Sequence, residues 1–219
     1  MAAAQTALMV SKFRHSCLLI EVGEVRILLD PGGFSAGFES LTELSAVLLT
    51  HQHPDHLDAD RLLALLEANP QAGVFADVAS TAQLAERGVT AQAVKPGDDL
   101  RVADISVAVY GGKHADIAPG IPTPPNVGYA IDGRFAYSGD SHTPPPEPVQ
   151  VLAIPASAPW LKLSETVAFL QALKPQAVVP VHDAVLSEAG MNLSYGLYRR
   201  FADEQGTEFR VLDEQRSTF

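Results

Sequence analysis

One short segment constrains this chain more than any other, because it carries three histidines and an aspartate directly after an apolar run. The segment is Thr50-His51-Gln52-His53-Pro54-Asp55-His56, and the apolar run is Ala46 to Leu49. In extended backbone, side chains two residues apart point to the same side, so His51 and His53 can approach one ion. The proline favours a turn that would direct Asp55 and His56 toward a second ion, and paired ions lie roughly 3.5–4 Å apart. Imidazole is the commonest metal-ligand side chain. We therefore predict that this loop forms half of a dinuclear metal site.

Four further motifs place a polar side chain just after an apolar segment. They are Ile27-Leu28-Leu29-Asp30-Pro31, Gly111-Gly112-Lys113-His114-Ala115, Tyr137-Ser138-Gly139-Asp140-Ser141 and Val178-Val179-Pro180-Val181-His182. Each motif alone is weak evidence of a family relationship, but together, in this order around the loop, they form a convincing pattern. The flexibility of the two glycines before His114 would let that side chain turn toward the metals.

These motifs, in this order, resemble those of the metallo-β-lactamase superfamily, in which His-x-His-x-Asp-His follows a core strand. The resemblance spans nearly the whole chain. It implies an α/β fold, a four-layer αββα sandwich of two mixed β-sheets flanked by helices, formed by a single domain over residues 1–219.

The resemblance also implies a role for each polar residue. The expected ligands of the first metal are His51, His53 and His114. The expected ligands of the second are Asp55, His56 and His182. Asp140 is expected to bridge both ions, and Asp30 to support a metal-binding histidine by fixing its tautomer and orientation. Asp30 could instead be present for its turn preference alone.

Imidazole and carboxylate ligands suit zinc, manganese or iron. The iron-containing diiron reductases of this superfamily carry a glutamate where His53 stands, so that branch is disfavoured. We expect two divalent ions, with zinc the first choice and manganese the second.

The expected chemistry is hydrolysis by a hydroxide held between the two ions, because a bound divalent ion lowers the pKa of water from 15.7 to about 7. Asp55 or Asp140 could accept the proton and pass it to the leaving group. His142 could act as a general acid or contact a substrate phosphate, and a supporting or solvated histidine is an equal alternative. His15, in Arg14-His15-Ser16-Cys17, is expected to be a turn residue.

Leu57-Asp58, directly after the metal loop, resembles the branch that contains ascorbate-6-phosphate lactonase and N-acylphosphatidylethanolamine phospholipase D. This favours a hydrolase of a small-molecule lactone or phosphate ester. Three alternatives remain open: a cyclic-nucleotide or other phosphodiesterase or nuclease, a mononuclear iron dioxygenase of the same fold, and a non-catalytic binding module.

Composition and charge indicate which classes of partner and which cellular compartment to expect. The net charge of −11 argues against binding to nucleic acid or to anionic lipid, so a small-molecule substrate is expected. A single cysteine, Cys17, excludes an internal disulfide and fits a reducing compartment. Met1 to Val10 lacks the features of a signal peptide, and no apolar run approaches the ~20 residues that span a bilayer. The expected location is the cytoplasm.

Periodicity predicts strands in the first third and alternating strands and helices afterwards. The expected helices are Ala59 to Ala68 capped by Asp58, a segment around Ser80 to Arg87, a helix capped by Ser164 that runs to Leu173, and Asn192 to Gln205. Leu62, Leu63, Leu65 and Leu66 are expected to face inward, and Leu193, Leu197 and Phe201 to share one side of the last helix. Two proline-rich segments, residues 119–125 and 144–148, are expected to form walls of a substrate pocket or plain spacers.

Overall fold

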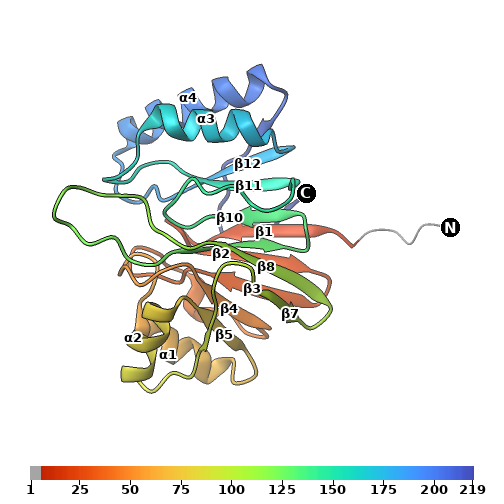
Figure 1. Cartoon of the computed structure of the whole chain (residues 1–219). Helices are drawn as coiled ribbons and strands as arrows, with labels where there is room; N and C mark the ends of the chain where they lie inside the picture. Colours follow the sequence, from red (N-terminus) through yellow and green to blue (C-terminus); the bar gives the residue numbers. More distant parts are fainter. Residues whose placement is uncertain (1–5) are drawn as a thin grey trace.

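Two mixed β-sheets lie face to face with a pair of helices on each outer side, which confirms the expected four-layer α/β fold (Figure 1). This computed structural model describes residues 6–219. The first sheet has the strand order β14-β1-β2-β3-β4-β5-β6, and the second has the order β13-β12-β11-β10-β9-β8-β7. The prediction that Met1 to Val10 is not a signal peptide falls partly on residues 1–5, outside the described part.

The first sheet and its helices are formed mainly by the N-terminal half. Its strands are β1 (Leu8–Lys12), β2 (Leu18–Val22), β3 (Val25–Leu29), β4 (Ala46–Leu49), β5 (Gly73–Ala76), β6 (Gln92–Ala93) and the C-terminal β14 (Ser217–Thr218). A short 3-10 helix, Phe38–Ser40, precedes β4, and the two α-helices are α1 (Ala59–Ala68) and α2 (Val78–Glu86).

The second sheet repeats this plan. Its strands are β7 (Asp99–Val102), β8 (Ile105–Gly111), β9 (Val127–Ile131), β10 (Phe135–Tyr137), β11 (Val151–Pro155), β12 (Ala177–Val181) and β13 (Glu208–Phe209). Its helices are α3 (Leu163–Leu173) and α4 (Glu188–Glu204). In both halves an antiparallel meander leads into parallel strands joined by helices. This similarity of order is visible only in three dimensions, since the sequence shows no clear repeat.

Apolar side chains fill three layers of core. Because successive side chains of a strand point to opposite faces, Ile27 and Leu29 of β3 enter the core between the sheets, whereas Leu28 packs toward α1 and α2. In β12, Val179 faces the other sheet and Val178 packs toward α3 and α4. Burial of each such side chain stabilises the fold by about 1.5–3 kcal/mol relative to exposure. Strands buried on both faces explain the continuous apolar runs in the sequence.

The first two helices show which capping predictions were correct. The range of α1 and its cap are confirmed, because the Asp58 side chain accepts a hydrogen bond from the Arg61 backbone N–H. Leu62 and Leu65 are buried, but Leu63 is 40% exposed, so the prediction that it faces inward was wrong. Helix α2 begins before Ser80, since the Asp77 carboxylate accepts hydrogen bonds from the first turn.

The two later helices also differ from the prediction at their N-termini. Helix α3 begins at Leu163, so Ser164 lies inside its first turn and is not the cap. Helix α4 begins at Glu188, where Ser187 accepts a hydrogen bond from the Gly190 N–H. The buried side chains of α4 are Tyr198 and Ala202. Of the three residues expected to share one side of this helix, Leu193 is 67% exposed, and Leu197 and Phe201 are partly buried.

The candidate site lies at one edge of the sandwich, where several strands of both sheets end. Asp30 follows β3, the loop 50–56 follows β4, His114 follows β8, Asp140 follows β10 and His182 follows β12. Carboxyl ends of parallel strands are the usual place for functional side chains in layered α/β folds. In the part of the chain that the structure describes, no helix is long and apolar enough to cross a membrane.

Candidate metal centre

Asp30 holds the start of the metal loop in place through three hydrogen bonds. Its fully buried carboxylate accepts the Thr50 backbone N–H at 2.8 Å and the Thr50 hydroxyl at 2.7 Å. The second of these oxygens, Oδ2, also accepts the Nδ1–H of His56 at 2.7 Å. Asp30 has a positive φ of 43°, which bends the chain away from β3 immediately after the strand. The role of Asp30 is thus to orient a histidine and a backbone turn, beyond any turn preference of its own.

A close backbone approach brings the loop after β3 against the metal loop. The Gly33 N–H donates to the Pro54 carbonyl at 2.7 Å. A Cβ at Gly32 would lie 2.0 Å from the Asp55 carbonyl oxygen, so only glycine fits there. The two loops therefore pack as a unit that fixes Asp55 and His56.

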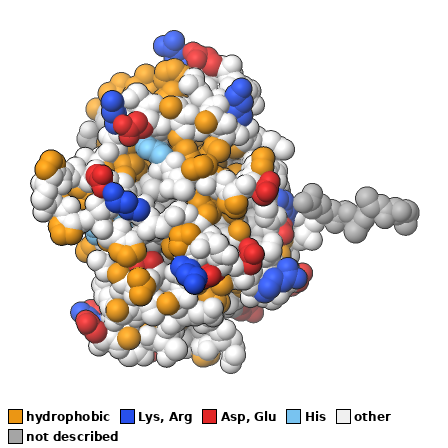
Figure 2. Space-filling model, in the orientation of Figure 1, with side chains coloured by type: hydrophobic (Ala, Val, Ile, Leu, Met, Phe, Trp, Pro, Cys, Tyr) orange, Lys and Arg blue, Asp and Glu red, His pale blue; other side chains and the backbone are white. Residues whose placement is uncertain are grey.

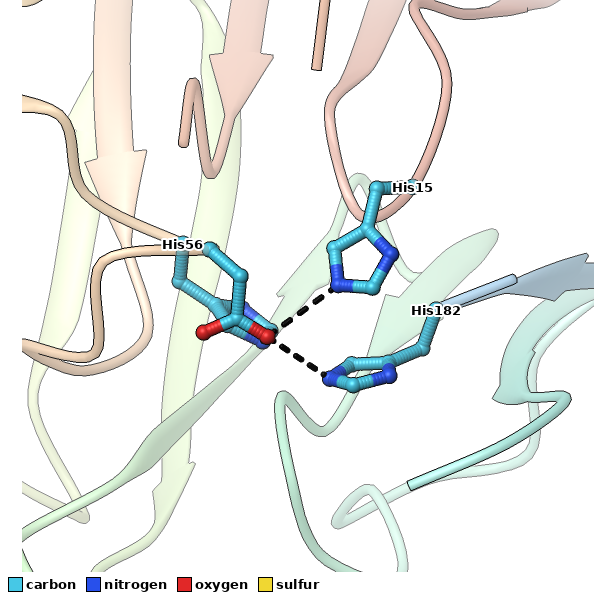
Figure 3. A group of neighbouring side chains, drawn as sticks. His15, His56 and His182 are labelled. Carbon is cyan, nitrogen blue, oxygen red and sulfur yellow. Dashed lines mark hydrogen bonds and ion pairs between the residues drawn. The ribbon is translucent and has the colours of Figure 1, made fainter. Parts of the chain in front are cut away.

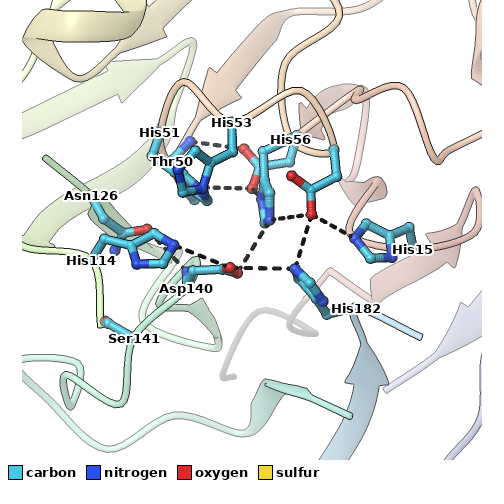
Figure 4. A network of polar contacts seen from close by, with 12 residues as sticks. His15, Thr50, His51, His53, His56, His114, Asn126, Asp140, Ser141 and His182 are labelled. Atoms are coloured by element: carbon cyan, nitrogen blue, oxygen red, sulfur yellow. Dashed lines mark hydrogen bonds and ion pairs between the residues drawn. The ribbon is translucent and has the colours of Figure 1, made fainter. Parts of the chain in front are cut away.

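Eight titratable side chains converge into two adjacent groups (Figure 4). The first group contains His51, His53, His114 and Asp140, and the second contains His15, Asp55, His56 and His182. Within each group, one nitrogen or oxygen from every residue lies within 4.8 Å of the others. The structure thus brings together all seven residues predicted as metal ligands, and it adds His15.

Four of these histidines direct Nε2 toward the centre, because their Nδ1 atoms face hydrogen-bond acceptors. The acceptors are Thr50 Oγ1 for His51 (3.0 Å), Asp30 Oδ2 for His56 (2.7 Å), the Ala115 carbonyl for His114 (2.6 Å) and the Ser157 carbonyl for His182 (2.5 Å). The Thr50 hydroxyl gives its only proton to Asp30, so it must accept from His51. A histidine with Nδ1–H held by an acceptor offers its Nε2 lone pair to a metal.

Several buried atoms at the centre have no hydrogen-bond partner within the described part of the protein. They are Nε2 of His56, Nε2 of His114, Nε2 of His182 and Oδ1 of Asp140. The Asp140 carboxylate lies 3.2–3.3 Å from these three nitrogens, with Oδ2 at 3.3 Å from both His114 and His182. Buried polar atoms without partners are costly unless a ligand satisfies them. Their number, chemistry and convergence fit two divalent cations.

The electrostatics of the centre also favour added positive charge. Burial raises the pKa of the Asp140 carboxyl, but His56, His114 and His182 outweigh this and hold it well below its ordinary value. Burial lowers the pKa of His182, yet Asp140 and Asp55 raise it overall to about 9. The pKa of His56 is raised in the same way by Asp140 and Asp30, despite its complete burial. A proton on these imidazoles occupies the place where a cation would bind.

Comparison with known proteins agrees with this geometry. Residues 9–182 match the model of a family described as a beta-lactamase superfamily domain. The chain belongs to this superfamily. Protein Rv0786c of Mycobacterium tuberculosis is a relative with 45% identity over 94% of this chain and 97% of its own length.

Solved structures share the superfamily fold at low sequence identity. Igni18, a metallo hydrolase from Ignicoccus hospitalis, has a TM-score of 0.75 at 21% identity over 98% of this chain and 99% of its own. The metallo-beta-lactamase fold protein YhfI from Bacillus subtilis has a TM-score of 0.76 at 15% identity, covering 98% of this chain and 100% of its own. These likenesses support the fold of this beta-lactamase superfamily member.

Asp140 of this superfamily member is positioned by two residues that the sequence did not reveal. The Trp160 indole N–H donates to Asp140 Oδ2 at 2.8 Å. The Asn126 amide oxygen accepts the Asp140 backbone N–H at 3.0 Å, and its NH₂ donates to the Ser138 carbonyl at 2.8 Å. Both residues lie far from Asp140 in the sequence and have no metal-ligand chemistry, so no local pattern could have identified them.

His142, predicted as a catalytic candidate, lies outside both groups of converging side chains in the described part of the protein. Its Nε2 lies 2.9 Å from the Thr166 hydroxyl on α3, and its ring packs edge-on against Trp160. Burial lowers the pKa of this imidazole. His142 therefore supports the Trp160 side of the site, and a role in proton transfer remains a prediction.

Proposed function

We propose that this beta-lactamase superfamily member is a metal-dependent hydrolase with two divalent ions, zinc first and manganese second. The observation that carries the proposal is the convergence of unpartnered Nε2 and carboxylate atoms at the edge where both sheets end. The proposed ligands of the first ion are His51, His53 and His114, and those of the second are Asp55, His56 and His182. Asp140 is the proposed bridge, and when bound the two ions would activate water and polarise the substrate's oxygen.

The protein's own residues orient the proposed ligands, leave one side of the site open to substrate and place a carboxylate there. Asp30 and Thr50 fix the tautomers of His56 and His51, as described above. His53 and Asp55 are partly exposed, whereas the other proposed ligands are buried, so substrate would approach from the side of these two residues. Burial raises the pKa of Asp55, but hydrogen bonds from His15 and His182 outweigh this and hold it well below its ordinary value, so this partly exposed carboxylate stays ionised. Proton transfer to the leaving group by Asp55 or Asp140 stays a prediction.

The proposed substrate is a small-molecule lactone or phosphate ester. The net charge of −11 disfavours long nucleic acid. Leu57 and Asp58, which resemble the lactonase and phospholipase D branch, have structural roles here: Leu57 is buried, and Asp58 caps α1. Both acyl and phosphoryl centres develop negative charge on oxygen during attack, which paired cations stabilise.

The decisive experiment compares initial rates on a simple lactone and on a chromogenic phosphodiester, with zinc-loaded and manganese-loaded protein in parallel. Faster turnover of the lactone supports attack at a carbonyl, and faster turnover of the diester moves the assignment to a phosphodiesterase. Iron-loaded protein is assayed for oxygen uptake, which would identify the dioxygenase alternative. Asp140→Ala should abolish hydrolysis, and unchanged turnover by this variant would refute the hydrolase proposal.

A further inference from the structure

His15 lies at the candidate metal centre, although the sequence suggested only a turn residue. Its side chain comes from the loop between β1 and β2, is fully buried, and has its Nε2 atom 3.1 Å from Asp55 Oδ2 (Figure 3). His182 Nε2 lies at the same distance, 3.1 Å, from that oxygen. Distance alone therefore allows two roles for His15, as a further metal ligand or as a hydrogen-bond donor to Asp55.

The partner of the other ring nitrogen distinguishes these roles. The backbone N–H of Ala184 points at His15 Nδ1, with a nitrogen–nitrogen distance of 3.3 Å. A backbone N–H can only donate, so Nδ1 must be the unprotonated nitrogen and the hydrogen of a neutral ring must lie on Nε2. His51, His56, His114 and His182 have the opposite arrangement, with Nδ1 against an acceptor.

The ring of His15 is held in this orientation by its surroundings. The His15 carbonyl accepts the His182 backbone N–H at 3.0 Å, and the two rings pack with centroids 4.1 Å apart. Phe34 packs edge-on against the same ring at 5.3 Å. Lys12, the buried last residue of β1, donates its Nζ to the Pro180 carbonyl at 3.0 Å and pairs with Asp183. The end of β1 therefore contacts the chain on both sides of His182, next to the loop that carries His15.

We propose that His15 is a positioning residue that donates its Nε2–H to Asp55 Oδ2 and does not bind metal. This donation fixes the carboxylate so that Oδ2 faces the Nε2 atoms of His182 and His56, at 3.1 and 3.8 Å. Through His15, the proposed ligand Asp55 of the N-terminal half is connected to the segment of the C-terminal half that carries His182. His15 thereby sets the geometry of the second ion's site and leaves the first ion's site untouched.

The inference rests on the proposed metal site, but its test does not depend on turnover. Protein labelled with ¹⁵N on histidine is loaded with ¹¹³Cd²⁺, and the imidazole signals are assigned by comparison with single His→Gln variants. His56 and His182 should show scalar coupling of Nε2 to cadmium, whereas His15 should show none and should retain its Nε2–H. Coupling between His15 Nε2 and cadmium would overturn the proposal.

The same spectra of chelator-treated protein separate failure of this inference from failure of the proposed function. An Nδ1–H tautomer of His15 in that sample would refute the inference directly, whatever the protein binds. If no cadmium binds at all, the proposed metal site fails, while the tautomer of His15 is still read.

Variants test the positional role by metal affinity, measured by competition with a chromophoric chelator. His15→Ala should weaken the second zinc equivalent by about 10- to 100-fold, the usual effect of losing a hydrogen bond to a ligand, and leave the first unchanged. His15→Gln, whose amide N–H lies near the position of Nε2, should restore most of the affinity. The shorter His15→Asn cannot reach Asp55 and should behave like alanine. Wild-type affinity in His15→Ala, or equal loss in the glutamine and alanine variants, would contradict the proposal.

Discussion

At the scale of single residues, several side chains at this site orient the proposed ligands through hydrogen bonds. Thr50 is the clearest case, because one buried hydroxyl donates to Asp30 and accepts from His51. This arrangement ties the tautomer of a proposed ligand of the first ion to the aspartate that orients a proposed ligand of the second. Loss of the Thr50 hydroxyl should therefore weaken the binding of both ions.

Thr50→Val removes this hydroxyl while keeping a similar shape. We expect metal affinity to fall by about 10- to 100-fold. The free energy of unfolding of the metal-free protein should fall by about 1–3 kcal/mol, because the buried His51 Nδ1–H loses its acceptor. Calorimetric zinc titration and urea denaturation measure the two effects. Thr50→Ser keeps the hydroxyl and is the matched control; equal zinc affinity in both variants would contradict the assigned role.

Trp160 offers a direct optical test of the Asp140 assignment, because it is the only tryptophan in the chain and its indole N–H contacts Asp140 Oδ2. We expect Co²⁺, a paramagnetic ion, to quench the emission of chelator-treated protein as it binds beside this carboxylate. Asp140→Asn should greatly reduce both the binding and the quenching. Full Co²⁺ binding in the wild type with unchanged emission would place the ion elsewhere.

At the scale of elements, the loops that end the strands are shaped by close contacts that only glycine permits. Gly139, between β10 and Asp140, has a φ of +59°, and a Cβ there would lie 2.3 Å from Asn126 Oδ1 and 2.7 Å from Thr50 Cβ. Gly133, in the turn between β9 and β10, has a similar φ of +62° but no atom within 4 Å of its Cβ position. Alanine substitutions at these two glycines therefore distinguish the cost of backbone strain from the cost of steric overlap.

Gly133→Ala should cost only the left-handed backbone penalty, about 1–2 kcal/mol of unfolding free energy. Gly139→Ala should cost this amount and a further ~1–3 kcal/mol for overpacking, because the contacted atoms belong to the buried network around Asp140. It should also lower metal affinity, which Gly133→Ala should not. Urea midpoints and zinc titrations check both variants, and equal stability of the two would show that the loop at Gly139 relaxes freely.

Some elements and site residues could be predicted from the sequence, and others could not. Strand β4 coincides with the apolar run Ala46 to Leu49, and β3 and β12 end directly before Asp30 and His182, as their motifs indicated, because apolar runs bounded by turn residues are local signals. The seven proposed ligands were found for the same reason, since each follows such a run. The buried residues of α4, Tyr198 and Ala202, were not singled out from the sequence. His15, Trp160 and Asn126 were missed because their contacts join distant segments.

At the scale of the whole molecule, the site joins two halves of similar order (Figure 1). The strands that carry its residues end at the same edge; they are β3 and β4 of the first sheet and β8, β10 and β12 of the second. Charged side chains of both signs are scattered over the face shown in Figure 2, without a continuous basic patch there, which is consistent with the small-molecule substrate proposed above. Charged side chains of the two halves also lie in contact at the site. Asp55, from the first half, lies 3.1 Å from His182 of the second, and Asp140 of the second lies 3.2 Å from His56 of the first.

This coupling predicts an unusual pH dependence for the stability of metal-free protein. The pKa of His182 is about 9 in the folded chain, against about 6.5 for an unfolded histidine. Between these values the folded state binds more protons than the unfolded state, so stability falls as pH rises. The contribution of His182 is complete below about pH 6.5, is lost through pH 9, and amounts to at most about 3 kcal/mol. The raised pKa of His56 acts in the same direction.

Urea denaturation of chelator-treated protein between pH 6.5 and 9 measures this loss. His182→Asn lacks the titrating group, so its stability should change less over the same range, and the difference between the two curves isolates His182 from other titrations such as that of Lys12. Saturating zinc should flatten the wild-type curve over this range, because the bound ion requires neutral imidazoles and replaces their protons. A flat curve for the metal-free wild type would show that the carboxylates of the two halves do not hold His182 in its protonated form.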